Sequence, residues 1–257
     1  MPTYNEVLNI PELLGRLDEV RKQVEFDLLV VDDSSPDDTA AAVRSMQSLR
    51  RWLHLFVRSG PLGLGSAYRD GFRWGLDRRY EWIGEMDADL SHEPEALPAL
   101  VTRAIEGADL VLGSRYVTGG RCPDWPVRRR VLSRAANLFA RTVLRLPVRD
   151  VTSGFRIYSN PAVRRVLETG TDCDGYGFQV EAVHTVFRAG LPIAEIPIVF
   201  RDRTRGTSKM SLATALEAAR RCLVLAVSPA SRSATGSGTP TMSPGSALNR
   251  PTAEGGA

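Results

Sequence analysis

The sequence predicts an α/β fold in which helices cover both faces of one mostly parallel, doubly wound sheet, and two observations carry this prediction. Apolar runs that suit buried strands alternate with amphipathic stretches up to about residue 115, as is typical of such sheets. The acidic clusters Asp32-Asp33 and Asp87-Ala88-Asp89 each follow an apolar run. Because ligands of doubly wound sheets bind beyond the carboxyl ends of the strands, these acids mark a candidate site.

Strand-to-helix repeats account for the first half of the chain. The predicted strands are the apolar runs FDLLVV, LHLFV, YEWI and ADLVLG. The first three lead into stretches with helical periodicity, at 37–49, 62–77 and 94–105. Pro36 and Pro94 stand at helix starts, where the fixed φ of proline is favourable.

The second half of the chain predicts a less regular pattern. A Gly/Pro-rich loop from residue 118 leads into an arginine-rich amphipathic helix. The remaining expected elements are turns at 149–159, a helix at 176–190, a strand at 193–200 and a helix at 210–227. We expect one catalytic domain at 1–227, followed by a disordered tail at 228–257 that is rich in Ser, Thr, Gly, Pro and Ala.

Charge and cysteine content exclude several classes of protein. A net charge of +3 is too small an excess to predict a nucleic-acid partner. The three cysteines lack the spacing of a disulfide framework or a zinc site, which favours a reducing compartment. There is no apolar run of about 18 residues and no signal-peptide pattern, so the chain is expected to be cytoplasmic.

Asp87 and Asp89 place two carboxylates on the same side of an extended segment. Such hard oxygen ligands suit Mg²⁺ or Mn²⁺ held against a substrate diphosphate. A solvated turn at a strand end would use the same residue types, so this alternative stays open. Asp32 or Asp33 is expected to bind a ribose or base, while Ser34 or Ser35 caps the next helix. An aspartyl-phosphate receiver domain would also carry acids at strand ends, but such a domain is shorter.

Basic residues complete the predicted site. Arg115, Arg203 and Lys209 follow predicted strands that open on the same edge of the sheet as the acids. Cations there would stabilise a departing diphosphate, whereas surface solvation explains any one of them alone. His54 and His184, like His92, have no metal-ligand spacing and are expected to be structural.

Taken together, the motifs resemble one family. They are PTYNE, VVDDSSPDDT, GLGSAYRDGF, MDADLSHEPE, GSRY, SRAAN, DVTSGFRIY, GFQVE and EIPIVFRDRTRGTSKMS, in order from about residue 2 to 226. This set closely resembles polyprenol (dolichyl) phosphate mannosyltransferases, which are inverting family 2 glycosyltransferases of the GT-A fold. The resemblance implies transfer of mannose from GDP-mannose to a polyprenyl monophosphate with Mg²⁺ or Mn²⁺. It also implies peripheral attachment at the cytoplasmic face of an anionic membrane, directly or through a membrane-anchoring protein.

The resemblance also assigns residues by motif. Donor binding is expected at Pro2, Tyr4, Glu6, Val31, Asp33, Asp87, Ala88, Asp89, Arg115, Arg203 and Lys209. The catalytic subset is Asp89, Arg115, Arg203 and Lys209, and the metal ligands are Asp87, Asp89 and Ser91. Acceptor binding is expected at Arg130, Arg134, Ser153 and Arg156.

Two departures from the family pattern bear on these expectations. Ser91 stands where many relatives have Gln, and this shorter side chain would reach a metal only through water. Family members run an apolar strand into PTYNE, whereas here Met1 directly precedes Pro2. We therefore expect a void and unpaired backbone groups where a central strand would lie, and either a longer native chain or a poorly stable one.

Alternative functions stay open at this point. A related transferase would use UDP-glucose or another nucleotide sugar, and a non-catalytic protein would bind a nucleotide or a membrane surface. For the predicted arginine-rich helix, packing on the sheet with a solvated basic face competes with docking on anionic headgroups. A phosphate acceptor is already an anionic nucleophile, so the predicted mechanism needs no strong general base.

Overall fold

The computed structural model describes residues 1–169, 176–202 and 212–227. Arg203, Lys209 and the expected tail at 228–257 lie outside the described residues.

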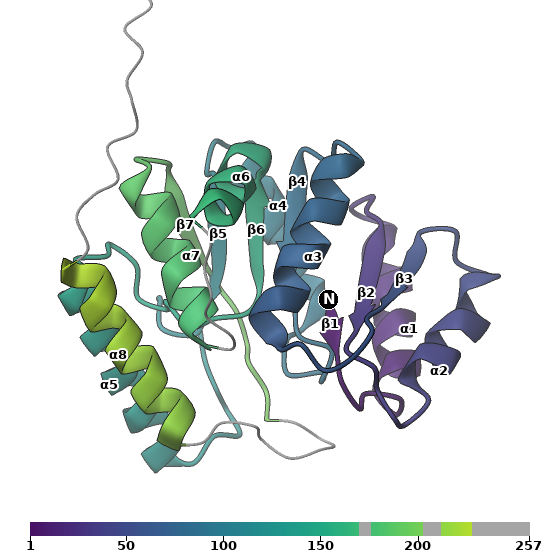
Figure 1. The fold of residues 1–257 in the computed structure, drawn as a ribbon, viewed down its shortest axis with the longest axis horizontal. Helices are drawn as coiled ribbons and strands as arrows, with labels where there is room; N and C mark the ends of the chain where they lie inside the picture. Colours follow the sequence, from purple (N-terminus) through teal and green to yellow (C-terminus); the bar gives the residue numbers. More distant parts are fainter. Residues whose placement is uncertain (170–175, 203–211, 228–257) are drawn as a thin grey trace, which may run out of the picture.

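The described strands form two sheets (Figure 1). The first is parallel, in the order β1-β2-β3, with β1 at Pro2–Thr3, β2 at Leu28–Asp32 and β3 at Leu53–Val57. The second has the order β4-β6-β5-β7, with β4 at Trp82–Glu85, β5 at Leu110–Ser114, β6 at Arg156–Ser159 and β7 at Ile193–Pro197. Strand β6 is antiparallel to both neighbours, and β5 and β7 are parallel. The mostly parallel sheet is confirmed, but the turns expected at 149–159 were wrong in their last part, which forms β6.

Helices lie on both faces, as expected. Their bounds are Ile10–Arg21 (α1), Thr39–Gln47 (α2), Leu64–Asp77 (α3), Leu97–Ile105 (α4), Val127–Val143 (α5), Asn160–Glu168 (α6), Tyr176–Arg188 (α7) and Leu212–Val227 (α8). Successive strand residues point to opposite faces. Leu110 and Leu112 accordingly pack into the core with α3, α6 and α7. Val111, between them, packs with α1 and α4.

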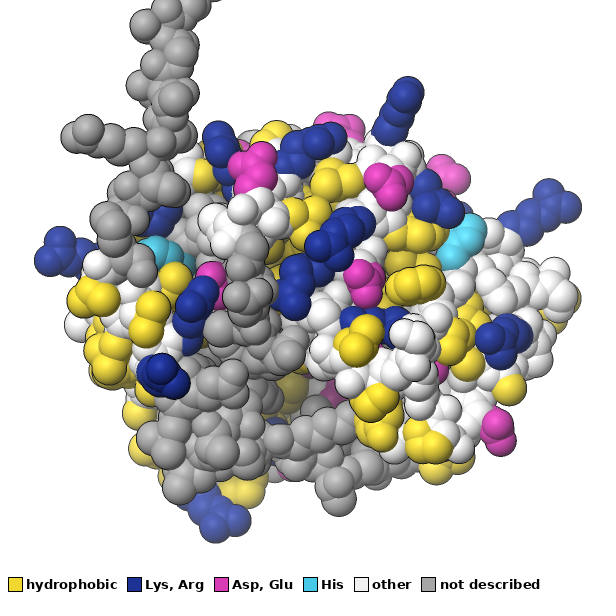
Figure 2. Space-filling view, in the orientation of Figure 1, with side chains coloured by type: hydrophobic (Ala, Val, Ile, Leu, Met, Phe, Trp, Pro, Cys, Tyr) yellow, Lys and Arg dark blue, Asp and Glu magenta, His cyan; other side chains and the backbone are white. Residues whose placement is uncertain are grey.

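Helices α5 and α8 lie side by side, away from the sheets (Figure 1). No residue from Val127 to Ala136 is buried, although Val131 and Leu132 are apolar and more than half exposed. Leu223 and Val227 of α8 are exposed as well. Figure 2 shows hydrophobic and basic side chains together on the end of the molecule where these helices lie.

Candidate active site

The loops that follow β1 and β2 are joined by buried polar contacts. Asp32 is fully buried, and its carboxylate accepts hydrogen bonds from Thr3 Oγ1 at 3.1 Å and from Ser35 Oγ at 2.6 Å. Asn5 N donates to Ser35 Oγ at 3.0 Å. These bonds fix the loop that carries Tyr4 against the β2 end. They leave Asp32 committed to holding the two loops together.

The other residues near the N-terminus that the motifs assign to donor binding differ in exposure. Tyr4 and Glu6 are half-buried on the fixed loop, and Glu6 Oε2 accepts from Asn9 Nδ2 at 2.6 Å. Pro2 lies in β1, paired with Val31 of β2. The side chain of Val31 is buried with Ala67 of α3, so the structure does not present it to a ligand. Their donor-binding roles stay predictions.

Asp33 is held by a residue that sequence reasoning missed. Arg58 Nη1 donates to Asp33 Oδ1 at 2.7 Å, and the backbone amides of Leu62 and Gly63 donate to the same carboxylate at 3.0 and 3.1 Å. Arg58 is buried and also forms an ion pair with Asp70 at 3.1 Å. The sequence does offer a signal for Arg58, which stands directly after LHLFV. Residues at the ends of neighbouring parallel strands lie at the same edge of the sheet, so Arg58 is expected near Asp33.

The turn after β4 carries the predicted metal ligands. The Asp87 backbone N–H donates to His92 Nδ1 at 3.3 Å, so that nitrogen carries no proton. Burial lowers the pKa of His92 to about 4, against an opposing effect of Asp89, and the ring is therefore neutral near pH 7. Asp89 is buried, and its Oδ1 accepts from the Ser91 amide at 3.0 Å. The expectation that His92 is structural fits this geometry.

Ser91 supplies the test of whether a metal fits here. Its hydroxyl is buried and has no hydrogen-bond partner among the described residues, although buried hydroxyls are normally paired. Asp87, about a third exposed, and Asp89 offer carboxylate oxygens on the same turn. The described residues contain no group of three or more His, Cys, Asp or Glu side chains that would close a metal site alone. Mg²⁺ and Mn²⁺ sites commonly use few protein ligands plus phosphate and water, so these residues fit such an ion.

Arg115 is enclosed by protein groups. Its Nε and Nη2 donate to the two oxygens of Asp150 at 2.7 and 2.6 Å, and Nη2 also donates to Thr152 Oγ1 at 2.8 Å. Burial alone would lower the pKa of Arg115, but the charge and hydrogen bonds of Asp150 raise it. The guanidinium lies 5.4 Å from the ring centre of Trp125 and 5.3 Å from that of Phe200. This pairing fixes the 150–154 loop, and a phosphate contact by Arg115 stays a prediction.

The 150–154 loop reaches the acidic turn. A Cβ added to Gly154 would lie 3.2 Å from Asp87 Oδ1, a distance that requires the carboxylate to shift. Tyr68 OH donates to the same oxygen at 3.4 Å. Glycine at 154 therefore lets the backbone approach the Asp87 carboxylate closely.

The expected acceptor residues differ in exposure: Ser153 and Arg156 are buried, Arg130 is half-buried and Arg134 is exposed. Arg156 is fully buried, and its guanidinium donates to the carbonyls of Ser153, Val151 and Gln179 at 2.7, 2.7 and 2.9 Å. Ser153 is also buried, so the structure places both residues beneath the site rather than on its surface. Arg130 and Arg134 lie on α5, and the Arg134 guanidinium stands 5.6 Å from the ring centre of Tyr116.

A second missed arginine links α5 to the site. Arg129 Nη1 donates to Asp202 Oδ1 at 2.7 Å, and its guanidinium stacks 4.0 Å from the ring centre of Trp125. Because Trp125 also flanks Arg115, the start of α5 is tied to the same aromatic cluster. Sequence reasoning missed Arg129 because it stands within the arginine run at 128–130, where helical spacing alone did not distinguish it from its neighbours.

The family described as Glycosyl transferase family 2 matches residues 1–167. The chain belongs to this family. The undecaprenyl-phosphate mannosyltransferase of Micrococcus luteus is 44% identical to this chain over 211 residues. The match covers 82% of this chain and 86% of that protein. The polyprenol monophosphomannose synthase of Mycolicibacterium smegmatis is 42% identical over 82% of this chain and 79% of its own length. These relatives confirm the resemblance that the motifs indicate.

Solved structures place the family 2 transferase in a known fold. The glucosyl-3-phosphoglycerate synthase of Mycobacterium tuberculosis with phosphoglyceric acid gives a TM-score of 0.65 at 21% identity, over 90% of this chain and 79% of that one. The same synthase with Mn²⁺, UDP-glucose and phosphoglyceric acid gives 0.64 at 22% identity, with the same coverage. At this identity the likeness shows the fold alone, and it confirms the GT-A prediction.

Proposed function

We propose that this family 2 transferase moves mannose from GDP-mannose to a polyprenyl monophosphate, giving a polyprenyl β-D-mannosyl phosphate and GDP. The observation that carries the proposal is the acidic turn at the β4 end, with two aspartates and the buried, unpartnered hydroxyl of Ser91. The names of the M. luteus and M. smegmatis relatives support mannose and a polyprenyl phosphate as the transferred sugar and the acceptor.

The proposed reaction is a single displacement at the sugar. An acceptor phosphate oxygen attacks C1 of mannose from the face opposite the diphosphate, the C1–O bond to GDP breaks, and the configuration inverts. Asp87, Asp89 and Ser91 would hold Mg²⁺ or Mn²⁺, and the bound ion would neutralise charge on the departing diphosphate. Arg115, with Arg203 and Lys209 outside the described residues, is proposed to contact the phosphates. No side chain needs to remove a proton, because the acceptor oxygen is already ionised near neutral pH.

A donor and acceptor panel tests the reaction. Purified protein should release GDP and form polyprenyl mannosyl phosphate when given GDP-mannose, polyprenyl phosphate and Mg²⁺ or Mn²⁺, and EDTA should stop both. Faster turnover with UDP-glucose would contradict the proposed donor. Retained GDP binding without transfer from any sugar nucleotide would instead support the non-catalytic alternative. Product stereochemistry, measured from the anomeric proton–carbon coupling, tests inversion separately.

We also propose that the exposed half of α5 docks on an anionic membrane. Among the described residues no helix is long and apolar enough to cross a bilayer. Val127, Val131 and Leu132 are exposed, and Arg128 and Arg134 lie among them. Apolar side chains in the interface beside cations at the headgroups are the features of a membrane-surface helix.

Vesicle sedimentation tests this docking. The double variant Arg128→Gln/Arg134→Gln should bind phosphatidylglycerol vesicles several-fold more weakly and show a raised KM for the lipid acceptor. Arg44→Gln/Arg51→Gln removes the same charge from exposed positions on and after α2 and should leave both quantities unchanged. Equal losses in the two variants would show a bulk-charge effect, and no vesicle binding by the wild type would favour recruitment by an anchoring protein.

A further inference from the structure

The carboxylate of Asp87 is contacted from outside its own turn. Asp89 Oδ1 accepts from the Ser91 amide, two residues further along the same turn, at 3.0 Å. Asp87 Oδ1 accepts from the hydroxyl of Tyr68, which belongs to α3, at 3.4 Å. The Asp87 side chain is about a third exposed, so its orientation depends on such contacts. The two predicted metal ligands are therefore oriented by different parts of the fold.

Helix α3 brings Tyr68 to the acidic turn. The helix begins at Leu64, shortly after β3 ends at Val57, so its first turns lie at the edge where the parallel strands end. Tyr68 is only 3% exposed. The hydroxyl of a buried tyrosine usually has a hydrogen-bond partner, and here the ring lies in the core while the hydroxyl reaches Asp87.

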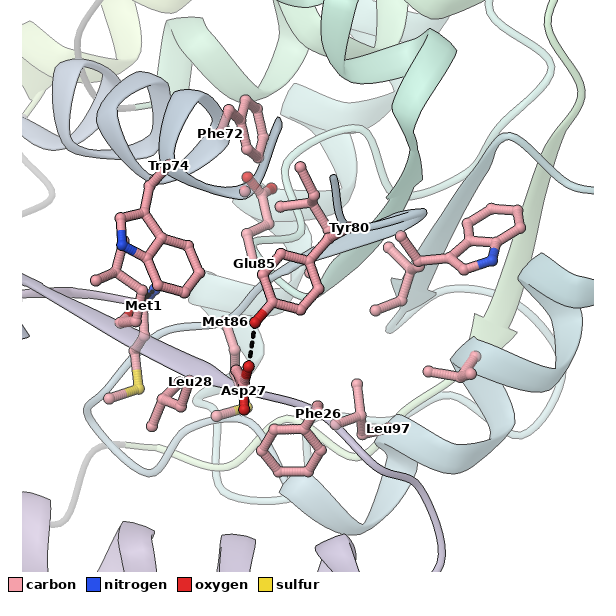
Figure 3. Close-up of a pocket in the computed structure, with 18 of the residues that line it drawn as sticks. Met1, Phe26, Asp27, Leu28, Phe72, Trp74, Tyr80, Glu85, Met86 and Leu97 are labelled. Carbon is pink, nitrogen blue, oxygen red and sulfur yellow. Dashed lines mark hydrogen bonds between the residues drawn. The ribbon is translucent and has the colours of Figure 1, made fainter. Parts of the chain in front are cut away.

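Aromatic packing fixes the ring of Tyr68. It stacks on Phe178 of α7, with ring centres 5.5 Å apart and the two planes at 14°. The ring of Phe72, one helical turn after Tyr68, lies 6.2 Å from that of Phe178 and 5.1 Å from that of Tyr158 on β6. Figure 3 shows Phe72 beside Glu85, the last residue of the strand that leads into the acidic turn. A ring packed this closely has little freedom to move its hydroxyl.

Tyr68 is the donor in its contact with Asp87. A phenol, whose ordinary pKa is about 10, is protonated at neutral pH and can donate, whereas an ionised carboxylate only accepts. Tyr68 is also uncharged, so it orients the carboxylate without forming an ion pair with it. The negative charge of Asp87 therefore stays available to attract a divalent ion.

The rest of Asp87 is confined as well. Its backbone N–H donates to His92 Nδ1 at 3.3 Å, which holds the main chain of the turn. A Cβ built on Gly154 would lie 3.2 Å from Asp87 Oδ1 and 3.3 Å from Oδ2, so the 150–154 loop limits the carboxylate on a further side. With the main chain and Oδ1 both held, the direction of Oδ2 is set too.

We propose that Tyr68 is a positioning residue for the divalent metal, whose hydroxyl holds Asp87 Oδ1 and so sets the direction in which this carboxylate faces the ion. Tyr68 acts through Asp87 and is not itself a ligand. Hydrogen-bond partners of this kind orient metal-ligating side chains, and their loss typically costs about 10–100-fold in metal affinity or activity. This inference rests on the metal assignment in the proposed function.

Tyr68→Phe tests the inference, because it removes the hydroxyl and keeps the ring that stacks on Phe178. Calorimetric titration with GDP at a series of Mn²⁺ concentrations needs no transfer. The Mn²⁺ concentration that supports half-maximal GDP binding should rise by about tenfold or more, and the half-saturating Mn²⁺ for transfer should rise in parallel. GDP binding in EDTA should be unchanged, since the substitution removes no expected nucleoside contact.

Tyr158→Phe is the matched control. Tyr158 is fully buried in the same aromatic group, but its hydroxyl bonds to Arg156 at 3.1 Å and to Glu85 at 3.3 Å. Its removal should lower stability in urea and leave the Mn²⁺ requirement unchanged. A loss of stability alone reduces the amount of folded enzyme and does not shift the half-saturating Mn²⁺ concentration.

The outcomes separate this inference from the proposed function. If Mn²⁺ strengthens GDP binding by the wild type and Tyr68→Phe has the same Mn²⁺ requirement, the role of Tyr68 is refuted and the proposed function stands. Equal shifts in Tyr68→Phe and Tyr158→Phe would also refute it, because a loosened core would then explain both. GDP binding by the wild type that responds to neither Mn²⁺ nor EDTA would overturn the metal assignment and this inference with it.

Discussion

The two loops that meet at the site differ in whether their buried polar groups have hydrogen-bond partners in the protein. In the 150–154 loop, Asp150 is fully buried and both of its oxygens are bonded to Arg115. In the turn after β4, the buried hydroxyl of Ser91 and Nε2 of His92 have no partner among the described residues. A buried group whose partners are all protein holds the structure in place. A buried polar group without a partner requires an explanation. For the Ser91 hydroxyl, which lies on the same turn as Asp87 and Asp89, the explanation we propose is a bound metal and diphosphate.

The largest effect on activity is therefore expected in the β4 turn. Asp89→Asn keeps the acceptor for the Ser91 amide but removes the charge that would hold a divalent ion. Transfer should fall by roughly 10²–10³-fold, on the scale of a lost electrostatic contact in a catalytic site. Initial rates over a Mg²⁺ and Mn²⁺ titration measure this, with urea unfolding to show that stability is retained. Asp77→Asn, at an exposed position on α3, is the matched control, and wild-type rates for Asp89→Asn would contradict the metal assignment.

For the buried Arg115–Asp150 pair, the main effect of a substitution is expected on the stability of the protein instead. Asp150→Asn leaves the buried Arg115 guanidinium without its counter-charge, and the free energy of unfolding should fall by about 3–5 kcal/mol. Arg115→Met combined with Asp150→Leu removes both charges and should recover part of this loss. Urea denaturation of the wild type, Asp150→Asn and the double variant measures both the loss and its recovery. A loss of transfer with undiminished stability in Asp150→Asn would instead show that the pair serves the chemistry directly.

The sequence could predict the features that depend on local residue patterns, but not those that depend on long-range pairing. Strands β2, β3, β4 and β5 follow from apolar runs, and the acids at 32–33 and 87–89 stand at or directly after the ends of two of these runs. Strand β6 was missed because its residues RIYS look polar, although Arg156 is fully buried by bonds to three carbonyls. The partners of Asp33 and Arg115 were missed because they lie 25 and 35 residues away along the chain. Spacing along a chain identifies elements, whereas such pairings depend on how the elements pack.

The smallest effect is expected where the two loops touch. Gly154→Ala places a Cβ 3.2 Å from Asp87 Oδ1 and 3.3 Å from Oδ2, so the carboxylate must move by a few tenths of an ångström. The backbone there needs no left-handed conformation, since Gly154 is not among the residues with positive φ. We expect transfer to fall by about tenfold or less and the metal concentration for half-maximal rate to rise, because small misplacements of catalytic groups cost less than their removal. Gly15→Ala, on α1 with nothing within 4 Å of the new Cβ, is the matched control. An unchanged metal requirement in Gly154→Ala would mean that the 150–154 loop does not position Asp87, and the two loops would then act independently.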